Sequence, residues 1–208
     1  MNKHITIIAG FGRCGSSLVM QMLAAGGMAT PHSEFPSYEI NDWTGVFVSD
    51  FYGGAIKILD PHIHQPPVGP VYRWIWLDRD PVEQAKSMAK FWKAAVVDDP
   101  SMPFMTEFTG DQIAKLAEAF KRDRPRANGL MLKYTQPAGI LKLRFESILA
   151  DPAEAAKQLN AFCGGKLDEW AMVAAVRPRG PECLPYPLEL EQLEKNDGFQ
   201  DAVDLGAR

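Results

Sequence analysis

Hydrophobic residues along the chain are concentrated in short runs that predict β-strands. Residues 5–9, Ile-Thr-Ile-Ile-Ala, are mostly β-branched and end at Gly10, which is typical of a buried parallel strand. Residues 55–59 and 71–77 predict two further strands, the second rich in aromatic side chains, and residues 140–145 predict a fourth. Between the first and second runs, and again between the third and fourth, the apolar positions have a helical spacing.

Four helices are predicted from apolar spacing and from the residues at which helices begin. Residues 16–25 place large apolar side chains on one face and are followed by two glycines, which commonly end helices. Asp80, Thr109 and Asp151 each open an N-cap motif and begin the other three helices, the first of which is expected to run to about Ala95. Strands that alternate with helices predict an α/β three-layer fold with a mostly parallel central sheet flanked by helices.

Composition and charge exclude several classes of protein. The chain has 208 residues, 46% of them hydrophobic and 23% charged, which excludes intrinsic disorder and suits one domain over residues 1–208. Its formal net charge of −4 argues against a dedicated nucleic-acid-binding protein. The three cysteines are widely spaced and predict neither a disulfide framework nor a zinc cluster, and no apolar run approaches the roughly 18 residues of a membrane span. We therefore expect a cytoplasmic protein with no membrane or nucleic-acid partner.

Three segments have no regular apolar period. Residues 28–54 carry six aromatic side chains, which either pack beneath the sheet or line a pocket for a substrate. Residues 93–110 contain proline, methionine and phenylalanine and either cover a site or form a simple loop. Residues 182–208 form an acidic tail with seven acidic residues against two basic ones, so the rest of the chain is close to neutral. The negative charge of the whole chain therefore says little about the charge of a ligand.

A glycine-rich segment, Gly-Phe-Gly-Arg-Cys-Gly-Ser-Ser over residues 10–17, joins the first predicted strand to the first predicted helix. A helix N-terminus at the carboxyl end of a parallel strand favours an anionic ligand. The segment matches the dinucleotide-binding pattern G-x-G-x-x-G, which also requires a second strand that ends in an acidic residue. Glu34 lies at a tolerable distance, but the residues before it include a proline and no strand run, so this interpretation is rejected.

The same segment also fits part of the Walker A pattern. Gly10, Gly15 and Ser17 are in register with that pattern, but Ser16 stands where it requires a lysine. Without the lysine, the β- and γ-phosphates of ATP lack the cation that the motif provides. Asp78, at the end of a predicted strand, is a candidate Walker B aspartate. A kinase that uses Mg-ATP is therefore kept as an alternative.

Residues 12–17, Gly-Arg-Cys-Gly-Ser-Ser, resemble the 5′-phosphosulfate loop of sulfotransferases that use 3′-phosphoadenosine-5′-phosphosulfate (PAPS), which usually reads Pro, Lys or Arg, Ser, Gly, Thr, Thr. Residues 5–27 as a whole are similar to the opening of bacterial members of that family. The resemblance implies a P-loop NTPase-like fold and a loop that binds the 5′-phosphate. The loop residues concerned are Gly12, Arg13, Cys14, Gly15, Ser16 and Ser17. Arg13 would also stabilise the leaving phosphate and the sulfuryl oxygens.

A second resemblance follows the third predicted strand, where Arg79 precedes Ser87 by eight residues. An arginine at a strand end and a serine two turns into the next helix can meet at one doubly charged group; the alternative is a surface ion pair and a solvated serine. In the family, such a pair binds the 3′-phosphate of PAPS. Arg179 and Gly180 stand where many members carry Arg-Lys-Gly for the same phosphate, with a plain basic turn as the alternative. Phe145 replaces a tyrosine of the family, so its hydroxyl contact is lost.

The base that takes the acceptor's proton is the least determined part of the site. Sulfuryl transfer needs an in-line acceptor, a base and cations on the leaving phosphate. Family members that act on small molecules often carry a histidine two residues after a lysine on the second strand, but here Lys57 is followed at that position by Leu59. His62 and His64, just downstream, are candidate replacements, but Glu34, placed after the first helix like the glutamate of other members, is preferred over His62. Lys57 is expected to reach the sulfuryl group as a second cation.

The expected activity is transfer of a sulfuryl group from PAPS to a hydroxyl or an amine of a small molecule, with release of adenosine 3′,5′-bisphosphate (PAP). A sulfuryl group carries less charge than a γ-phosphoryl group, so no metal ion is expected. The aromatic residues of segment 28–54 favour an apolar or aromatic acceptor. A catalytically silent nucleotide-binding protein of the same fold is a further alternative, because the expected histidine is missing.

Overall fold

The central feature of the fold is a four-stranded parallel sheet. The computed structural model describes residues 4–30, 47–96 and 108–180. Its strands are β1 (His4–Gly10), β2 (Ala55–Leu59), β3 (Val71–Asp78) and β4 (Thr135–Arg144). They lie in the order β2-β1-β3-β4, and every neighbouring pair is parallel. The predicted sheet is confirmed with two corrections to the fourth strand: it begins at Thr135 instead of residue 140, and Phe145, predicted to be its last residue, begins a helix.

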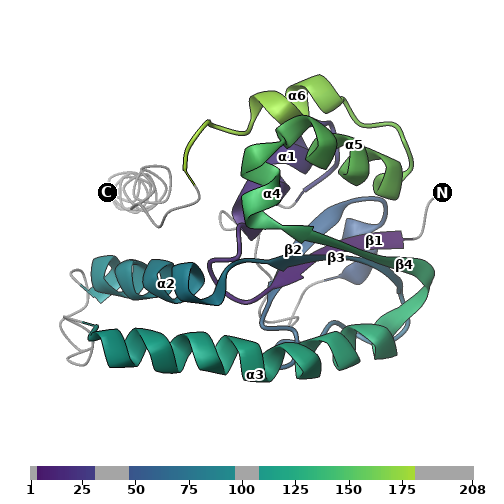
Figure 1. Ribbon diagram of the computed structural model, residues 1–208. Helices are drawn as coiled ribbons and strands as arrows, with labels where there is room; N and C mark the ends of the chain where they lie inside the picture. Colours follow the sequence, from purple (N-terminus) through teal and green to yellow (C-terminus); the bar gives the residue numbers. More distant parts are fainter. Residues whose placement is uncertain (1–3, 31–46, 97–107, 181–208) are drawn as a thin grey trace, which may run out of the picture.

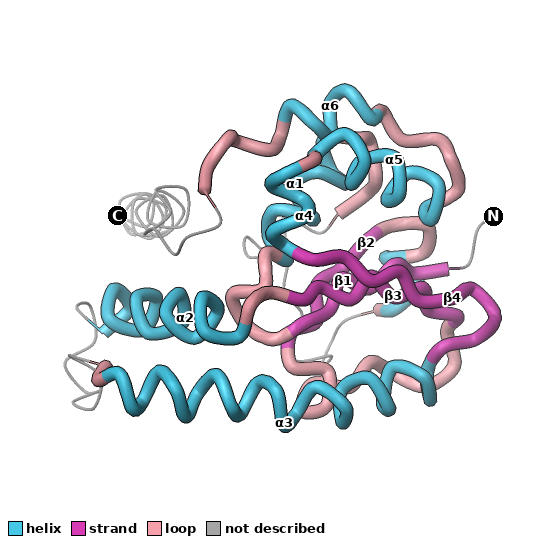
Figure 2. The backbone as a smooth tube through the Cα atoms, viewed as in Figure 1, coloured by secondary structure: helices cyan, strands magenta, loops and turns pink. Residues whose placement is uncertain are grey.

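Helices cover both faces of the sheet. They are α1 (Ser16–Ala25), α2 (Pro81–Val96), α3 (Gly110–Tyr134), α4 (Phe145–Ala150), α5 (Pro152–Cys163) and α6 (Glu169–Ala174), and a short 3₁₀-helix, η1, spans Val48–Phe51. Figure 1 shows α1, α4, α5 and α6 on one face of the sheet and α2 and α3 on the other. The same three layers are visible in the backbone trace of Figure 2. The predicted α/β three-layer fold is therefore confirmed.

Side chains of the strands alternate between two apolar cores, because successive residues of a strand point to opposite faces. On one face, Ile8 and Ile75 pack with apolar residues of α1, α5 and α6. On the other face, Ile7, Trp74 and Trp76 pack with apolar residues of α3. All five side chains are buried. Burial on both faces explains why the central strands are continuous apolar runs in the sequence.

The predicted helix starts are confirmed by their hydrogen bonds. Asp80 and Asp151 each accept the backbone N–H three residues further on, at 3.0 Å. At the start of α3, the N–H of Thr109 donates to Gln112 Oε1 at 2.8 Å, and the N–H of Gln112 donates to Thr109 Oγ1 at 3.3 Å. The short helices α4 and α6 were not predicted, although Asp168 caps α6 in the same way.

The order of the strands determines where the glycine-rich segment lies. β1 has β2 on one side and β3 on the other, so the chain leaves β1 in one direction and later crosses back over it. Ligands of parallel sheets bind at such a switch point, outside the carboxyl ends of the strands. Residues 10–17 follow the carboxyl end of β1 and occupy this point.

Several predicted segments lie wholly or partly outside the described residues. In segment 28–54 the described parts include η1, and in segment 93–110 they include the last turn of α2. The covering role of both segments stays a prediction, as do the acidic tail 182–208 and the single domain over 1–208. In the described parts of the chain, no helix combines the length and the apolar character needed to cross a bilayer.

Gly15 and Gly27 form a matched pair of substitutions that tests the packing around the glycine-rich segment. Both have a left-handed backbone, with φ values of 96° and 91°, which costs an L-residue about 1–2 kcal/mol. A Cβ at Gly15 would lie 2.4 Å from Phe145 Cδ2, whereas a Cβ at Gly27 meets nothing within 4 Å.

We expect Gly27→Ala to lower the free energy of unfolding by about 1 kcal/mol. Gly15→Ala should lower it by about 2–4 kcal/mol, because a displaced ring adds to the backbone strain. Urea denaturation of the two variants measures the difference. Equal losses would show that the ring of Phe145 moves aside without resistance.

Candidate functional site

The loop between β1 and α1 turns sharply and leaves the first turn of α1 without a capping side chain. Arg13 and Gly15 have positive φ values of 68° and 96°, and the N–H of Cys14 donates to the carbonyl of Phe11 at 3.2 Å. Gly15 is the N-cap of α1, so no side chain at that position accepts from the first N–H groups. Because those N–H groups carry partial positive charge, this end of the loop suits an anion.

Arg13 directs its side chain toward α2. Its Nε donates to Ser87 Oγ at 3.2 Å, and its guanidinium carbon lies 5.1 Å from the ring centre of Phe91. Ser87 and Phe91 are four residues apart and therefore share one face of the helix. The structure thus brings Arg13, predicted to face the 5′-phosphate, next to Ser87, predicted to bind the 3′-phosphate.

Two arginines from distant parts of the chain share the ring of Phe145. The guanidinium carbons of Arg79 and Arg179 lie 4.5 and 5.1 Å from its centre, within the range of cation–π interactions. Arg79 is buried, and its Nη1 donates to the carbonyl of Arg13 at 3.1 Å. The ring of Phe145 therefore holds the guanidinium groups of both arginines in place. The predicted 3′-phosphate residues Arg79, Ser87 and Arg179 are brought together beside the loop.

Lys57 approaches the loop from its other side. It lies on β2, and its Nζ is 3.5 Å from Ser17 Oγ in the first turn of α1. Its side chain is buried, so it is not a solvated strand lysine. Because β2 and β3 lie on opposite sides of β1, this contact and the contact between Arg13 and Ser87 are on opposite sides of the loop.

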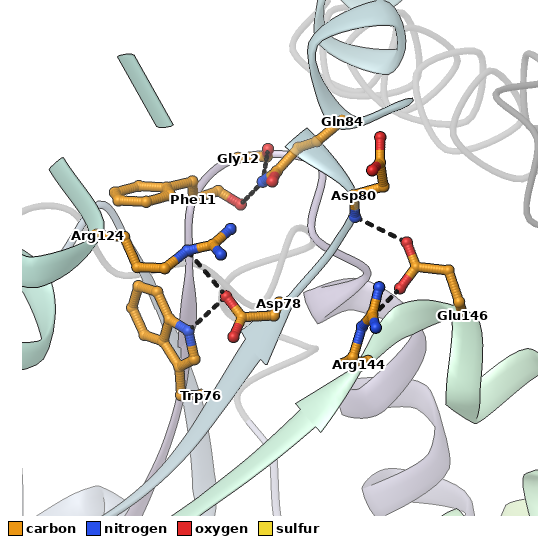
Figure 3. A network of polar contacts seen from close by, with 9 residues as sticks. All are labelled: Phe11, Gly12, Trp76, Asp78, Asp80, Gln84, Arg124, Arg144 and Glu146. Atoms are coloured by element: carbon orange, nitrogen blue, oxygen red, sulfur yellow. Dashed lines mark hydrogen bonds and ion pairs between the residues drawn. The ribbon is translucent and has the colours of Figure 1, made fainter. Parts of the chain in front are cut away.

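Gln84 is a residue of this site that the sequence did not reveal. It is buried on α2, and its Nε2 donates to the carbonyls of Phe11 and Gly12 at 3.1 and 2.9 Å (Figure 3). One signal could have identified it: Gln84 lies one helical turn before Ser87, on the same face of the helix.

The carboxylate of Asp78 is held by neighbouring side chains. Its Oδ1 accepts a hydrogen bond from Trp76 Nε1 at 2.9 Å and forms an ion pair with Arg124 Nε at 3.2 Å (Figure 3). A Walker B aspartate would instead hold a magnesium ion. These contacts tie the end of β3 to α3.

Of the two bases weighed against each other, Glu34 and His62, only His62 lies among the described residues. Its ring meets the ring of Phe11 edge-on, with centroids 5.7 Å apart, so it lies beside the start of the loop. Its Nδ1 is buried, with no hydrogen-bond partner in the described part of the chain, so Nε2 is the ring nitrogen suited to proton exchange. Glu34 lies outside the described residues, and the preference for it stays a prediction. Gly180 is the last described residue.

Cys14 fills space inside the loop. Burial raises the pKa of its thiol to about 11, although the N–H and hydroxyl of Ser16 and the ammonium of Lys57 favour the thiolate. A Cβ at Gly10 would lie 2.5 Å from the Cys14 sulfur, so the thiol occupies the space beside the end of β1. The neutral, buried thiol is not suited to act as a nucleophile.

The fold is similar to that of sulfotransferases of known structure. The mouse sulfotransferase SULT7A1, in a crystal structure with PAP, aligns with a TM-score of 0.51 and 14% identity over 84% of this chain and 62% of that one. The sulfotransferase domain of the olefin synthase from Synechococcus PCC 7002 aligns with a TM-score of 0.51 and 16% identity over 90% of this chain and 82% of that one. The chain therefore spans less than two thirds of the mouse structure. No protein-family model matches the chain, and no curated protein matches it significantly.

The buried thiol of Cys14 makes stability depend on pH in the alkaline range. Because its pKa is raised from 9.0 to about 11, the neutral thiol stabilises the fold below pH 9, and this contribution is lost as the pH rises through 11. The free energy of unfolding of the wild type should therefore fall more steeply over this range than that of Cys14→Ala. The two changes should differ by about 2 kcal/mol. Urea denaturation at a series of pH values measures them, and parallel curves would contradict a buried neutral thiol.

Proposed function

We propose that the protein is a sulfotransferase that uses PAPS and a small-molecule acceptor. The observation that carries this proposal is a pair of cation–hydroxyl contacts on opposite sides of one glycine-rich loop. Arg13 Nε lies 3.2 Å from Ser87 Oγ on one side, and Lys57 Nζ lies 3.5 Å from Ser17 Oγ on the other. Two such contacts suit a ligand with two separate anionic groups, as PAPS has at its 3′ and 5′ positions.

We assign the 3′-phosphate to the side of the loop that faces α2. Ser87 offers a hydroxyl there, and Arg79 and Arg179 hold two guanidinium groups over the ring of Phe145. Guanidinium groups bind phosphate through paired N–H donors. Arg13 belongs to this group by its contact with Ser87, so we assign its side chain to the 3′-phosphate and its backbone to the 5′-phosphate.

We assign the 5′-phosphosulfate to the backbone of the loop, to Ser17 and to Lys57. When bound, PAPS supplies the sulfuryl group: a bond forms from the acceptor oxygen or nitrogen to sulfur, and the bond from sulfur to the phosphate oxygen of PAP breaks. The N–H groups of the loop and of the first turn of α1 hold the phosphate. The buried ammonium of Lys57 stabilises the negative charge that develops on the leaving oxygen, and the low polarity around it strengthens this attraction.

The acceptor must lose a proton during transfer, and we assign this step to Glu34 in preference to His62. If His62 served instead, its Nε2 would accept the proton, because Nδ1 is buried. For the acceptor we propose an apolar or aromatic compound. Phe47 and Tyr52 of segment 28–54 are exposed, which supports a substrate-facing role, whereas Phe51 is buried in the core.

The contacts of Asp78 favour sulfuryl transfer over a Mg-ATP kinase. A kinase of this fold needs that carboxylate for its magnesium ion, whereas here Trp76 and Arg124 hold it. The loop also has Ser16 where a Walker A loop has its lysine. Both features agree with a ligand whose binding relies on arginines and backbone N–H groups.

Calorimetry with PAP in the absence of divalent cations tests the proposal. Wild-type protein is expected to bind PAP, and to prefer it to Mg-ATP. Arg79→Lys should weaken PAP binding by about tenfold or more, because a lysine lacks both the paired donors and the planar group that lies over Phe145.

Arg73→Lys is the matched control for that variant. Arg73 lies near the other end of β3, where its Nη1 donates to the carbonyl of Phe162 at 3.2 Å, so its replacement should leave PAP affinity unchanged. A preference for Mg-ATP would support the kinase instead. Absence of binding to either nucleotide would contradict the proposal.

Replacement of the two candidate bases distinguishes them. Glu34→Ala is expected to lower the turnover number by about a hundredfold or more, the usual contribution of a general base, with little change in PAP affinity. His62→Ala should retain turnover, and so should His64→Ala, which replaces the other histidine of the same loop. Release of PAP from PAPS in the presence of a panel of phenols and alcohols measures the rates. Loss of turnover in His62→Ala alone would assign the base to His62.

A further inference from the structure

Gln84 is a polar side chain buried at the junction of α2 and the glycine-rich loop. It is 1% exposed, and its Nε2 donates to two consecutive carbonyls, those of Phe11 at 3.1 Å and Gly12 at 2.9 Å (Figure 3). A primary amide has two N–H donors, so one side chain serves both carbonyls. The two acceptors also determine the orientation of the amide, because its oxygen would be repelled by both of them.

Because peptide groups are planar, these two hydrogen bonds also determine the direction of two backbone N–H groups. In a trans peptide, the C=O of one residue and the N–H of the next point in opposite directions. The carbonyl of Phe11 points toward Gln84, so the N–H of Gly12 points away from it. The carbonyl of Gly12 also points toward Gln84, so the N–H of Arg13 points away as well. Gln84 therefore turns two consecutive N–H groups away from α2.

The loop needs these hydrogen bonds because its backbone conformation at Arg13 is energetically unfavourable. This residue has a φ of 68°, in the left-handed region that non-glycine residues rarely adopt. Gln84 binds the carbonyl before it, and Arg79 Nη1 binds the carbonyl of Arg13 itself at 3.1 Å. The peptide groups on both sides of the unfavourable residue are thus held by side chains from outside the loop.

One face of α2 packs along the loop. The residues on this face follow one another at spacings of three, one and three: Gln84, Ser87, Met88 and Phe91. Ser87 and Phe91 contact the side chain of Arg13. The methyl group of Met88 would lie 2.4 Å from a Cβ added at Gly12. Gln84 contributes the hydrogen bonds from this face to the loop backbone that determine the orientation of its peptide groups.

From these contacts we infer that Gln84 is a positioning residue of the anion site, which directs the N–H groups of Gly12 and Arg13 toward the 5′-phosphate. The identity of the ligand rests on the proposed function. The inference goes beyond that function because it assigns the shape of the loop to a residue outside the glycine-rich segment. Gln84 acts through the backbone and does not itself touch the ligand.

Gln84→Met tests the inference, because methionine has a similar length and no N–H donor. Gln158→Met is the control: Gln158 lies on α5 and donates to Glu154 at 2.8 Å, on the surface of the molecule. Calorimetry is expected to show PAP affinity at least about tenfold weaker in Gln84→Met and unchanged in the control. If the wild type binds PAP and Gln84→Met binds it equally well, the inference is overturned while the proposed function stands.

A measurement without ligand tests the role of Gln84 separately from the proposed function. NMR order parameters of the Gly12 and Arg13 amides are expected near 0.85 in the wild type and in Gln158→Met, and below about 0.6 in Gln84→Met, because the loop loses its support. If the wild type does not bind PAP, the proposed function fails and the order parameters decide the inference alone. Unchanged order parameters in Gln84→Met would then overturn it.

Gln84→Glu is the second variant, should the methionine variant not fold. A glutamate keeps the length and shape of the side chain, but it offers at most one O–H donor, so it cannot donate to both carbonyls. It should reproduce the weaker PAP binding and the lower order parameters of Gly12 and Arg13. Wild-type values for both quantities in Gln84→Glu would overturn the inference.

Discussion

The backbone path of residues 11–15 is the constraint on which the rest of the site depends. The path includes two left-handed residues, Arg13 and Gly15, and both Met88 of α2 and the ring of Phe145 pack closely against it. A Cβ at Gly12 or Gly15 would lie 2.4 Å from Met88 or Phe145, so the path has little freedom to shift. Because α1 begins directly after this loop, the position of its N-terminal N–H groups follows from the same constraint.

Phe145 links parts of the chain that are far apart in the sequence. It follows β4, its ring lies against Gly15, and the guanidinium groups of Arg79 and Arg179 lie over it. The next residue, Glu146, accepts the N–H of Asp80 at 2.8 Å, so the start of α4 also holds the start of α2 (Figure 3). The arginines and the glycine-rich loop are therefore positioned by one buried aromatic ring and its neighbour.

Much of the candidate site could be proposed from the sequence, because its parts carry local signals. The glycine-rich segment is contiguous, and Arg79 and Ser87 are joined by a strand end and a capped helix whose geometry is regular. Gln84 could not be predicted in the same way, because its role depends on two backbone carbonyls more than seventy residues earlier in the chain. The direction of the Arg13 side chain was also beyond prediction, since it results from packing against α2 and not from the residues beside it.

The sequence by itself determined the parallel sheet, the helix starts and the place of the glycine-rich loop. These features follow from local rules: apolar runs buried on both faces, side-chain N-caps and glycines where the backbone turns. Only the tertiary structure decided which partner each charged side chain contacts. Asp78 contacts Trp76 and Arg124, Arg13 contacts Ser87, and Lys57 contacts Ser17. Contacts of this kind depend on where separate elements lie in space, because a polar side chain that is buried must find its partner among residues that are distant in the chain.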